Sequence, residues 1–407
     1  MSTSLRRVAI VEPVRTAVGG FGGTLRPVKA EDLAAEVIKA VVDRTDIDPA
    51  RIEDVAFAQS YANSEAPCIG RWAAMHAGLP IEVPGLQVDR RCGGGLQAVV
   101  TAAMCVQTGA ADVVLAGGVE SMSNIEHYTT TARWGSRSGN QTLYDRLDRG
   151  RERSQPSWRF GEISGMIETA ENLAETYAIS RDESDAFAVR SHQRAAAAWE
   201  SGAFKDEVVA VEVPQRRTDP VLFDHDEGIR ADSSMETLAR LRALMPEGTV
   251  TAGNSAQQND AAAACLVVAE DKLEELGLEP IGWFEGWAAV GCEPATMGLG
   301  PVGAVRKLFD RTGVGFDDLD LIEINEAFAA QVLAVLKGWG VGLDEVDDRL
   351  NVNGSGISLG HPIGATGVRI MTTMLRELDR RGGGLALETM CIGGGQGMAA
   401  LFRGVGA

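Results

Sequence analysis

The sequence has few cysteines, fewer basic than acidic residues and no long hydrophobic run. Six cysteines in 407 residues show no metal-ligand spacing, which argues against a zinc site or a disulfide framework and favours reduced thiols in the cytoplasm. No stretch reaches the roughly 20 apolar residues of a membrane-spanning helix, and we expect no export signal. The net charge of −19 argues against nucleic-acid and membrane-surface binders. An anionic ligand therefore requires a local basic patch.

Apolar strands and amphipathic helices alternate along most of the chain, which predicts an α/β fold built from βαβ units. Between residues 121 and 249 buried strands become scarce, so this segment is interpreted as an insertion. Ser180 and Glu183 predict a capping box at the start of a long helix there. We expect strands at 8–11, 55–59, 86–88, 113–116, 265–269, 281–290, 319–324, 350–352 and 385–390, and helices at 30–42, 69–77, 168–177, 302–309, 327–336 and 363–378.

Arginines concentrate within the insertion, where seven of them face three acidic residues between positions 133 and 159. Charge runs usually form solvated surfaces, so this run is either a surface loop or a subunit contact. The alternative is a basic lip that attracts phosphate groups to an otherwise acidic protein. The arginines are Arg133, Arg137, Arg146, Arg149, Arg151, Arg153 and Arg159.

Cys92 follows a short strand and precedes three glycines and an apolar helix. This order places its thiol near a helix N-terminus, where unpaired N–H groups and the helix dipole favour the thiolate, which is a nucleophile. The alternative is a small buried residue that packs at a strand-to-helix turn.

The sequence near His361 repeats the order of strand, glycine turn and helix found around Cys92. Two similar halves packed together would bring these two turns to one shared interface, and ligand sites often form at such interfaces. His361 is either a base or a structural histidine. Cys391 ends a buried strand before a glycine turn whose N–H groups can converge on an anion, or else it is a core cysteine. Asn325, in NEAF, is either a site residue or a helix N-cap.

Taken together, these motifs resemble thiolases. VDRRCGGGLQA, TAGNSAQQNDAAA, EPATMGLGP, NEAFA, GSGISLGHPIGATGVR and CIGGGQG occur in the order and at roughly the spacing of that family. The resemblance implies a five-layered α/β fold of two similar βα halves, with homodimers or homotetramers as the assembly. The implied halves are 1–120 with 250–275, and 276–407, and the implied inserted loop domain is 121–249, which would cover the coenzyme A site.

The resemblance also implies reversible acyl transfer between coenzyme A thioesters by Claisen condensation and thiolysis, as in fatty acid metabolism. Cys92 would be the acylated nucleophile, His361 its base and Cys391 the acid/base for the Cα proton. Asn325 would hold a water that stabilises the enolate together with His361, and the N–H groups of Cys92 and Gly393 would form an oxyanion hole. The implied coenzyme A and acyl contacts are Met166, Ala252, Ser255, Ala256, Met297 and Phe328. Acetyl-CoA, acyl-CoA and free coenzyme A are the expected partners, without a metal or a permanently bound cofactor.

Several residues differ from those usual at the same motif positions in the family. Asp89 replaces an asparagine, Gly94 follows Gly93 where Ser is usual, Ala256 replaces a serine, and Gly165 stands where biosynthetic members often have histidine. None of these changes removes a reacting group. The motif NSAQ and Gly165 favour a degradative or broad-range thiolase over one that forms acetoacetyl-CoA, but the preference for acyl chain length stays open.

Two alternatives remain at this point. A ketosynthase-type condensing enzyme is disfavoured because such enzymes place a second histidine where this chain has NEAF. A non-catalytic acyl-CoA-binding protein could keep the fold, since fold alone does not establish activity. The presence of Cys92, Asn325, His361 and Cys391 argues against it.

Overall fold

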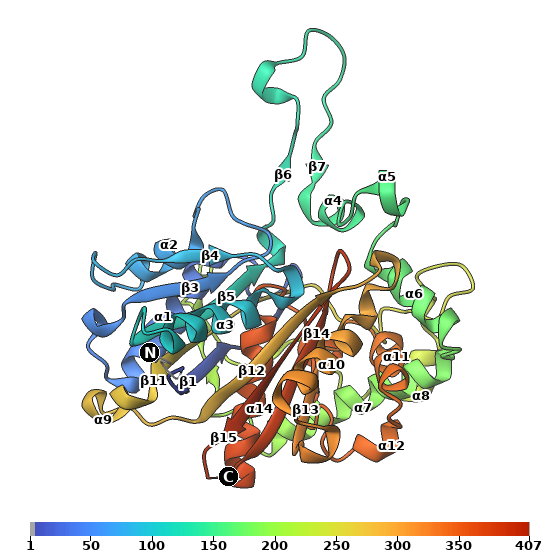
Figure 1. Cartoon of the computed structure of the whole chain (residues 1–407). Helices are drawn as coiled ribbons and strands as arrows, with labels where there is room; N and C mark the ends of the chain where they lie inside the picture. Colours follow the sequence, from blue (N-terminus) through green and yellow to red (C-terminus); the bar gives the residue numbers. More distant parts are fainter. Residues whose placement is uncertain (1–4, 407) are drawn as a thin grey trace.

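A computed structural model describes residues 5–406, and its centre is one mixed sheet of eleven strands (Figure 1). The sheet has two parts joined through β1 and β12, which pair only at Ala9–Trp283 and Ile10–Gly282. One part runs β1 (Val8–Thr16), β11 (Asn259–Ala269), β5 (Val113–Ser121), β3 (Asp54–Ala58) and β4 (Leu86–Val88). The other runs β12 (Gly282–Gly291), β15 (Gln396–Gly404), β14 (Gly384–Ile392) and β13 (Leu321–Ile324).

Helices cover the outer faces of both parts and fill the space between them. Helices α1 (Ala30–Thr45) and α2 (Ile69–His76) share one apolar cluster with β1, β5 and β11. Helices α3 (Gly94–Gln107) and α14 (Thr366–Arg381) lie in a second cluster that touches both parts of the sheet. Helices α10 (Gly300–Thr312) and α11 (Ala329–Trp339) bury a third. This succession of helix and sheet layers confirms the predicted α/β class.

Glycines let the two halves approach closely at the central layer. A Cβ at Gly95 of α3 would lie 2.9 Å from the carbonyl oxygen of Gly364 and 2.9 Å from the nitrogen of Val368. A Cβ at Gly118 of β5 would overlap the same carbonyl oxygen, and one at Gly367 would overlap the backbone of Leu96. The turn that precedes α14 is therefore held directly against β5 and α3.

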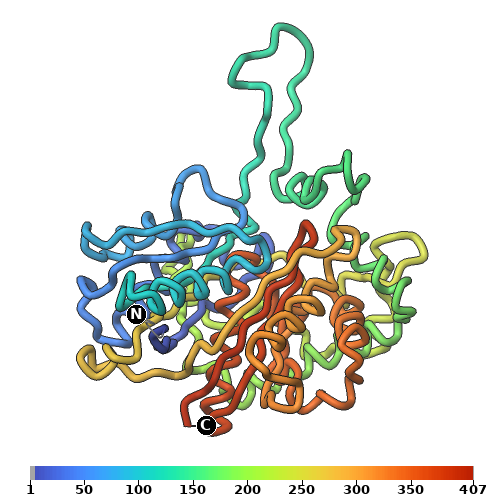
Figure 2. The backbone as a smooth tube through the Cα atoms, viewed as in Figure 1, coloured from blue at the N-terminus to red at the C-terminus, as the bar shows by residue number. Residues whose placement is uncertain are grey.

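The segment between β5 and β11 contains helices, short strands and a hairpin that projects from the body (Figures 1 and 2). The capping box of Ser180 and Glu183 is confirmed. The domain boundaries expected from the sequence stay a prediction. The elements of the segment between β5 and β11 are β6 (His127–Tyr128), β7 (Tyr144–Asp145), α4 (Arg146–Glu152), α5 (Ser157–Phe160), α6 (Met166–Thr176), α7 (Arg181–Glu200), β8 (Val208–Val209), β9 (Val211–Val213), β10 (Val221–Phe223) and α8 (Met235–Ala239).

The predicted strand at 350–352 is wrong, because only Leu350 forms a bridge, to Ile322. Asn351 adopts a φ of +46°, and its side chain accepts from the N–H of Ile324 and donates to the carbonyl of Ile324, both at 2.9 Å. The side-chain amide thus replaces a backbone partner. The last strand, β15, is absent from the predicted set. In residues 5–406 no helix is both long and apolar enough to cross a bilayer.

Candidate active site

A cavity of about 660 Å³ brings together residues that are far apart in the sequence. Cys92, His361 and Cys391 line it, so the turns of the two halves do meet, as the internal repeat predicts. Asn325 and Gly393 are the predicted site residues that do not line it. All six residues predicted to contact the substrate line the cavity: Met166, Ala252, Ser255, Ala256, Met297 and Phe328. The lining residues that the sequence did not predict include Met122, Asp148, Arg151, Ile167, Leu244 and Met245.

The Cys92 turn is held on both sides by hydrogen bonds. Cys92 lies in a single 3₁₀ turn just before α3 begins at Gly94. Arg91 has a φ of +47°, and its N–H donates to Asp89 Oδ1 at 2.8 Å. The hydroxyl of Ser60 donates to the carbonyl of Arg91 at 3.1 Å. Asp89 therefore supplies the acceptor that stabilises an unusual backbone conformation.

Burial raises the pKa of the Cys92 thiol and outweighs the groups that favour the thiolate. Those groups are the backbone N–H of Gly393, the Arg91 guanidinium, the N–H of Cys92 itself and Arg151. In the resting site burial thus outweighs the groups that the sequence predicts to favour the thiolate, and the nucleophilic role of Cys92 stays a prediction. The thiol needs a base, and the two N–H groups still converge on the sulfur.

The His361 ring is neutral, and among the described residues its Nε2 makes only a long contact, 3.5 Å to Asn325 Nδ2. Its Nδ1 lies 2.7 Å from Thr366 Oγ1, and that hydroxyl donates to the carbonyl of Pro362 at 3.0 Å. Because the hydroxyl proton is already used, Nδ1 carries a hydrogen and Nε2 keeps its lone pair. Burial, with Arg369 and Arg151, lowers the His361 pKa to about 3, so the ring is uncharged at neutral pH.

Asn325 packs behind the His361 ring. Its Nδ2 lies 3.4 Å from Nδ1 and 3.5 Å from Nε2, which are long contacts. Its Oδ1 is buried without a protein partner in the described part of the chain. Asn325 therefore lies next to His361 but does not line the cavity, so it could contact a ligand there only through a bridging group.

Cys391 ends β14 and is fully buried against the cavity wall. Burial raises its pKa well above the ordinary value, and Cys92 and Cys292 raise it further. The following turn needs glycine, since Gly394 and Gly395 have φ values of +90° and +86°. A Cβ at Gly393 would lie 3.3 Å from Met166 Sδ. The second thiol is thus protonated at rest and lies beside a crowded turn.

The part of the cavity wall that contains Ser255 and Ala256 is fixed to the start of α11. The N–H of Ala256 donates to the carbonyl of Ala327 and that of Ala329 to the carbonyl of Asn254, both at 2.9 Å. The Ser255 hydroxyl donates to the carbonyl of Thr251 at 2.7 Å. Ser255 and Ala256 therefore shape the wall through their backbone, since the Ser255 proton is already committed.

Glu120, which the sequence does not single out, links the turn that contains Cys92 to the turn that contains His361. Its Oε2 accepts from the N–H groups of Ser60 at 3.0 Å and Gly364 at 3.1 Å, and Oε1 accepts from Tyr61 at 3.3 Å. Ser60 in turn holds Arg91, and Gly364 follows His361 by three residues. Burial raises the Glu120 pKa to about 7. No sequence pattern marks it, because its partners are backbone groups.

We expect Glu120→Ala to lower the free energy of unfolding by at least about 3 kcal/mol. The substitution leaves three N–H groups without an acceptor, and each buried unsatisfied group costs about 1–3 kcal/mol. Glu120→Gln keeps the shape and one acceptor oxygen, so its loss should be smaller. Urea denaturation of both variants measures the difference. Wild-type stability in the alanine variant would show that the carboxylate does not support these turns.

The seven arginines do not form the single phosphate-attracting lip that was one of the two expectations. Arg133 and Arg137 are exposed on the projecting hairpin, whereas Arg151 lines the cavity. Three others, Arg146, Arg149 and Arg153, line a different hollow. The arginine run is divided because one helix, α4, presents its residues to two sides.

Comparison with protein families gives two matches that together span nearly all of the chain. Residues 8–271 match the family described as thiolase, N-terminal domain, and residues 278–404 match thiolase, C-terminal domain. The acetyl-CoA acetyltransferase of Chromobacterium violaceum is 46% identical over 396 residues, which cover 96% of this chain and 98% of that protein. The beta-ketothiolase BktB of Cupriavidus necator is 43% identical over 98% of this chain and 99% of its own length.

Solved structures agree with these sequence matches. The acetyl-CoA acetyltransferase of Bacillus anthracis superposes with a TM-score of 0.94 at 39% identity, covering 99% of this chain and 100% of that one. The human mitochondrial 3-ketoacyl-CoA thiolase gives a TM-score of 0.92 at 35% identity, with the same coverage.

Proposed function

Because the chain belongs to the thiolase family and is an acyltransferase acting on coenzyme A thioesters, we propose that Cys92, His361 and Cys391 carry out its reaction. One observation carries the assignment. The two thiols and the imidazole line one cavity although Cys92 is more than 260 residues from the other two in sequence, and the Nε2 of His361 keeps its lone pair. Such a site holds a nucleophile, its base and a separate proton-transfer group.

In the cleavage direction, His361 Nε2 takes the proton of Cys92, and the thiolate adds to the C3 carbonyl of a 3-ketoacyl-CoA. The C2–C3 bond then breaks, and its electron pair stays on C2 of the departing acetyl-CoA enolate. The Cys391 thiol protonates that carbon, so a raised pKa suits its role as an acid. The acyl group remains on Cys92 as a thioester.

Free coenzyme A completes the cycle by attacking the acyl-Cys92 thioester. His361 first passes the proton that it took from Cys92 to the Cys391 thiolate, which frees its Nε2 lone pair to accept the proton of the incoming thiol. The coenzyme A sulfur adds to the thioester carbonyl, the carbonyl–sulfur bond to Cys92 breaks, and His361 returns the proton to the Cys92 thiolate as acyl-CoA leaves. The N–H groups of Cys92 and Gly393 are suited to hold the oxyanion, since both favour negative charge beside Cys92 by lowering its pKa. Asn325 would act on the enolate through a bridging water.

For the substrate range, we propose that the enzyme cleaves acetoacetyl-CoA and also longer 3-ketoacyl-CoA esters. The apolar part of the cavity includes Met166, Ile167, Met297 and Phe328. A Cβ at Gly165 would meet only the Arg151 side chain, at 3.9 Å, so this part of the wall is open. The relatives named above include both an acetyl-CoA acetyltransferase and a 3-ketoacyl-CoA thiolase.

Thiolysis rates along a series of 3-ketoacyl-CoA esters of increasing length test the proposed substrate range. We expect kcat/KM to rise by no more than about 15-fold from acetoacetyl-CoA to the six-carbon ester, because burial of each of the two added methylenes contributes about 0.8 kcal/mol and no steric barrier opposes it. A sharp maximum at acetoacetyl-CoA would instead make this an acetyl-specific enzyme.

The enzyme is further proposed to act in the cytoplasm as a homodimer or homotetramer. Both reactive thiols must stay reduced, and a reducing compartment provides that. Strand β4 lies at one end of the strand order, with no further strand paired to it in residues 5–406, and Trp134 on the hairpin is 90% exposed, so both offer contact surfaces for a second copy. Light scattering of the purified protein would reveal a monomer if the assembly is wrong.

A further inference from the structure

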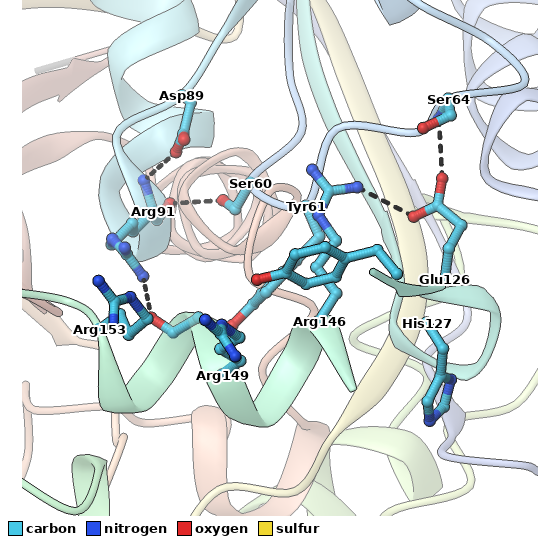
Figure 3. A pocket seen from close by; sticks show the side chains of 12 residues that line it. Ser60, Tyr61, Ser64, Asp89, Arg91, Glu126, His127, Arg146, Arg149 and Arg153 are labelled. Carbon is cyan, nitrogen blue, oxygen red and sulfur yellow. Dashed lines mark hydrogen bonds and ion pairs between the residues drawn. The ribbon is translucent and has the colours of Figure 1, made fainter. Parts of the chain in front are cut away.

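A second hollow, of about 720 Å³, lies beside α4 and shares no lining residue with the reaction cavity; Figure 3 shows the residues that line it. Four arginines line it, namely Arg91, Arg146, Arg149 and Arg153. They come from the nucleophile turn, from α4 and from the residue just after α4. Such a concentration of positive charge is unexpected in a chain whose net charge is −19.

The carboxylates in this hollow are already occupied. Glu126 pairs with Arg146 at 2.9 Å and accepts from the N–H of Ser64 at 2.8 Å. Asp89 accepts from the N–H of Arg91 at 2.8 Å. Within residues 5–406, Arg149 and Arg153 form no ion pair with a carboxylate. Two guanidinium groups therefore remain for an anion.

Aromatic rings hold one of these two arginines in place. The Arg149 guanidinium lies 3.5 Å from the centre of the Tyr144 ring and 5.9 Å from that of Tyr128. The two tyrosines face each other across the base of the hairpin, where β6 and β7 pair. A guanidinium that lies over a ring can still donate hydrogen bonds from its edge, so Arg149 is arranged in advance for an anionic ligand.

Helix α4 separates this hollow from the reaction cavity. Arg149 and Gly150 face the hollow, whereas Asp148 and Arg151 face the cavity, and no residue lines both. The side chain of Arg91 reaches across and donates to the carbonyl of Gly150 at 3.1 Å. The hollow thus adjoins the residue that precedes Cys92 without opening onto Cys92.

We propose that this hollow binds a small phosphate-bearing anion at a second site, distinct from the reaction cavity. The ligand class follows from the donors, because planar guanidinium groups pair with phosphate oxygens in bidentate fashion and a compact polyanion can contact several of them. The ligand is a free phosphate compound rather than the phosphorylated end of coenzyme A, because no residue lines both the hollow and the reaction cavity. The inference does not depend on the roles proposed for the two thiols.

Calorimetric titration of pyrophosphate into enzyme saturated with coenzyme A tests the site. Coenzyme A fills the reaction cavity, so pyrophosphate then reports on the hollow alone. We expect Arg149→Gln with Arg153→Gln to weaken binding by at least about 10-fold, since two charge-assisted contacts are lost. The matched control is Arg133→Gln with Arg137→Gln, which removes the same charge from the hairpin and should bind as wild type does.

Three outcomes would overturn the proposal. One is that the wild-type enzyme shows no pyrophosphate binding. Another is that the two double variants lose affinity equally, which would indicate only a general effect of net charge. The third is that saturating coenzyme A prevents binding and the Arg149 and Arg153 variant has a raised KM for coenzyme A but not for dephospho-coenzyme A. That result would assign the hollow to the phosphorylated end of the substrate.

Discussion

Replacing Cys92 by alanine should abolish thiolysis, with kcat for acetoacetyl-CoA reduced by at least about 10⁴-fold. The substitution removes the only group proposed to carry the acyl chain, and water cannot replace it in a cavity built around the sulfur. Cys92 also receives the two backbone N–H groups that are aimed at the developing charge. Loss of the nucleophile therefore removes both steps of the reaction, while binding of coenzyme A should remain.

The matched control for this variant is Cys68→Ala. Cys68 is exposed and lies at the start of α2, outside the residues that line the cavity. Steady-state thiolysis and fluorescence titration with coenzyme A measure the two properties separately. Residual activity of more than about a hundredth of the wild-type rate in Cys92→Ala would show that another group accepts the acyl chain.

Cys391→Ala should separate the two half-reactions. Without Cys391 no group is placed to move the proton at the Cα position, so cleavage and condensation should slow by about 10³-fold. Acyl transfer between coenzyme A and Cys92 needs only Cys92 and His361, so it should stay within about 10-fold of the wild-type rate. A variant with a merely structural defect would lose both activities together.

Exchange of labelled coenzyme A into acetyl-CoA measures acyl transfer, and thiolysis of acetoacetyl-CoA measures carbon–carbon cleavage. Cys292→Ala is the control, because Cys292 lies close enough to raise the Cys391 pKa but does not line the cavity. That variant should retain both activities. Normal thiolysis by Cys391→Ala would contradict the division of roles between the two thiols.

Much of the site could be predicted because its chemistry lies in short glycine-rich turns. Cys92, His361 and Cys391 each follow an apolar strand or precede an apolar helix, and the similarity of the two halves predicts that these turns meet. The structure brings them to one cavity. The charge state of Cys92 was not predictable in this way, since the helix N-terminus is visible in the sequence but the depth of burial is not.

Other features depend on contacts that no sequence pattern marks. Glu120 acts through backbone N–H groups of Ser60, Tyr61 and Gly364, which every residue type possesses. Asn351 ends a predicted strand because its side chain binds the backbone of Ile324. The sequence shows how many arginines the run contains but not which cavity each one lines, because that depends on how α4 lies between the two cavities.

The location of the acyl group tests the central claim most directly. The purified enzyme and the Cys391→Ala variant are incubated briefly with acetyl-CoA, quenched in acid, digested and mapped by mass spectrometry. The mechanism predicts one acetyl group on the peptide that contains Cys92 in both proteins and none in Cys92→Ala. An acetyl group on the Cys391 peptide, or no acylated peptide in any variant, would contradict it.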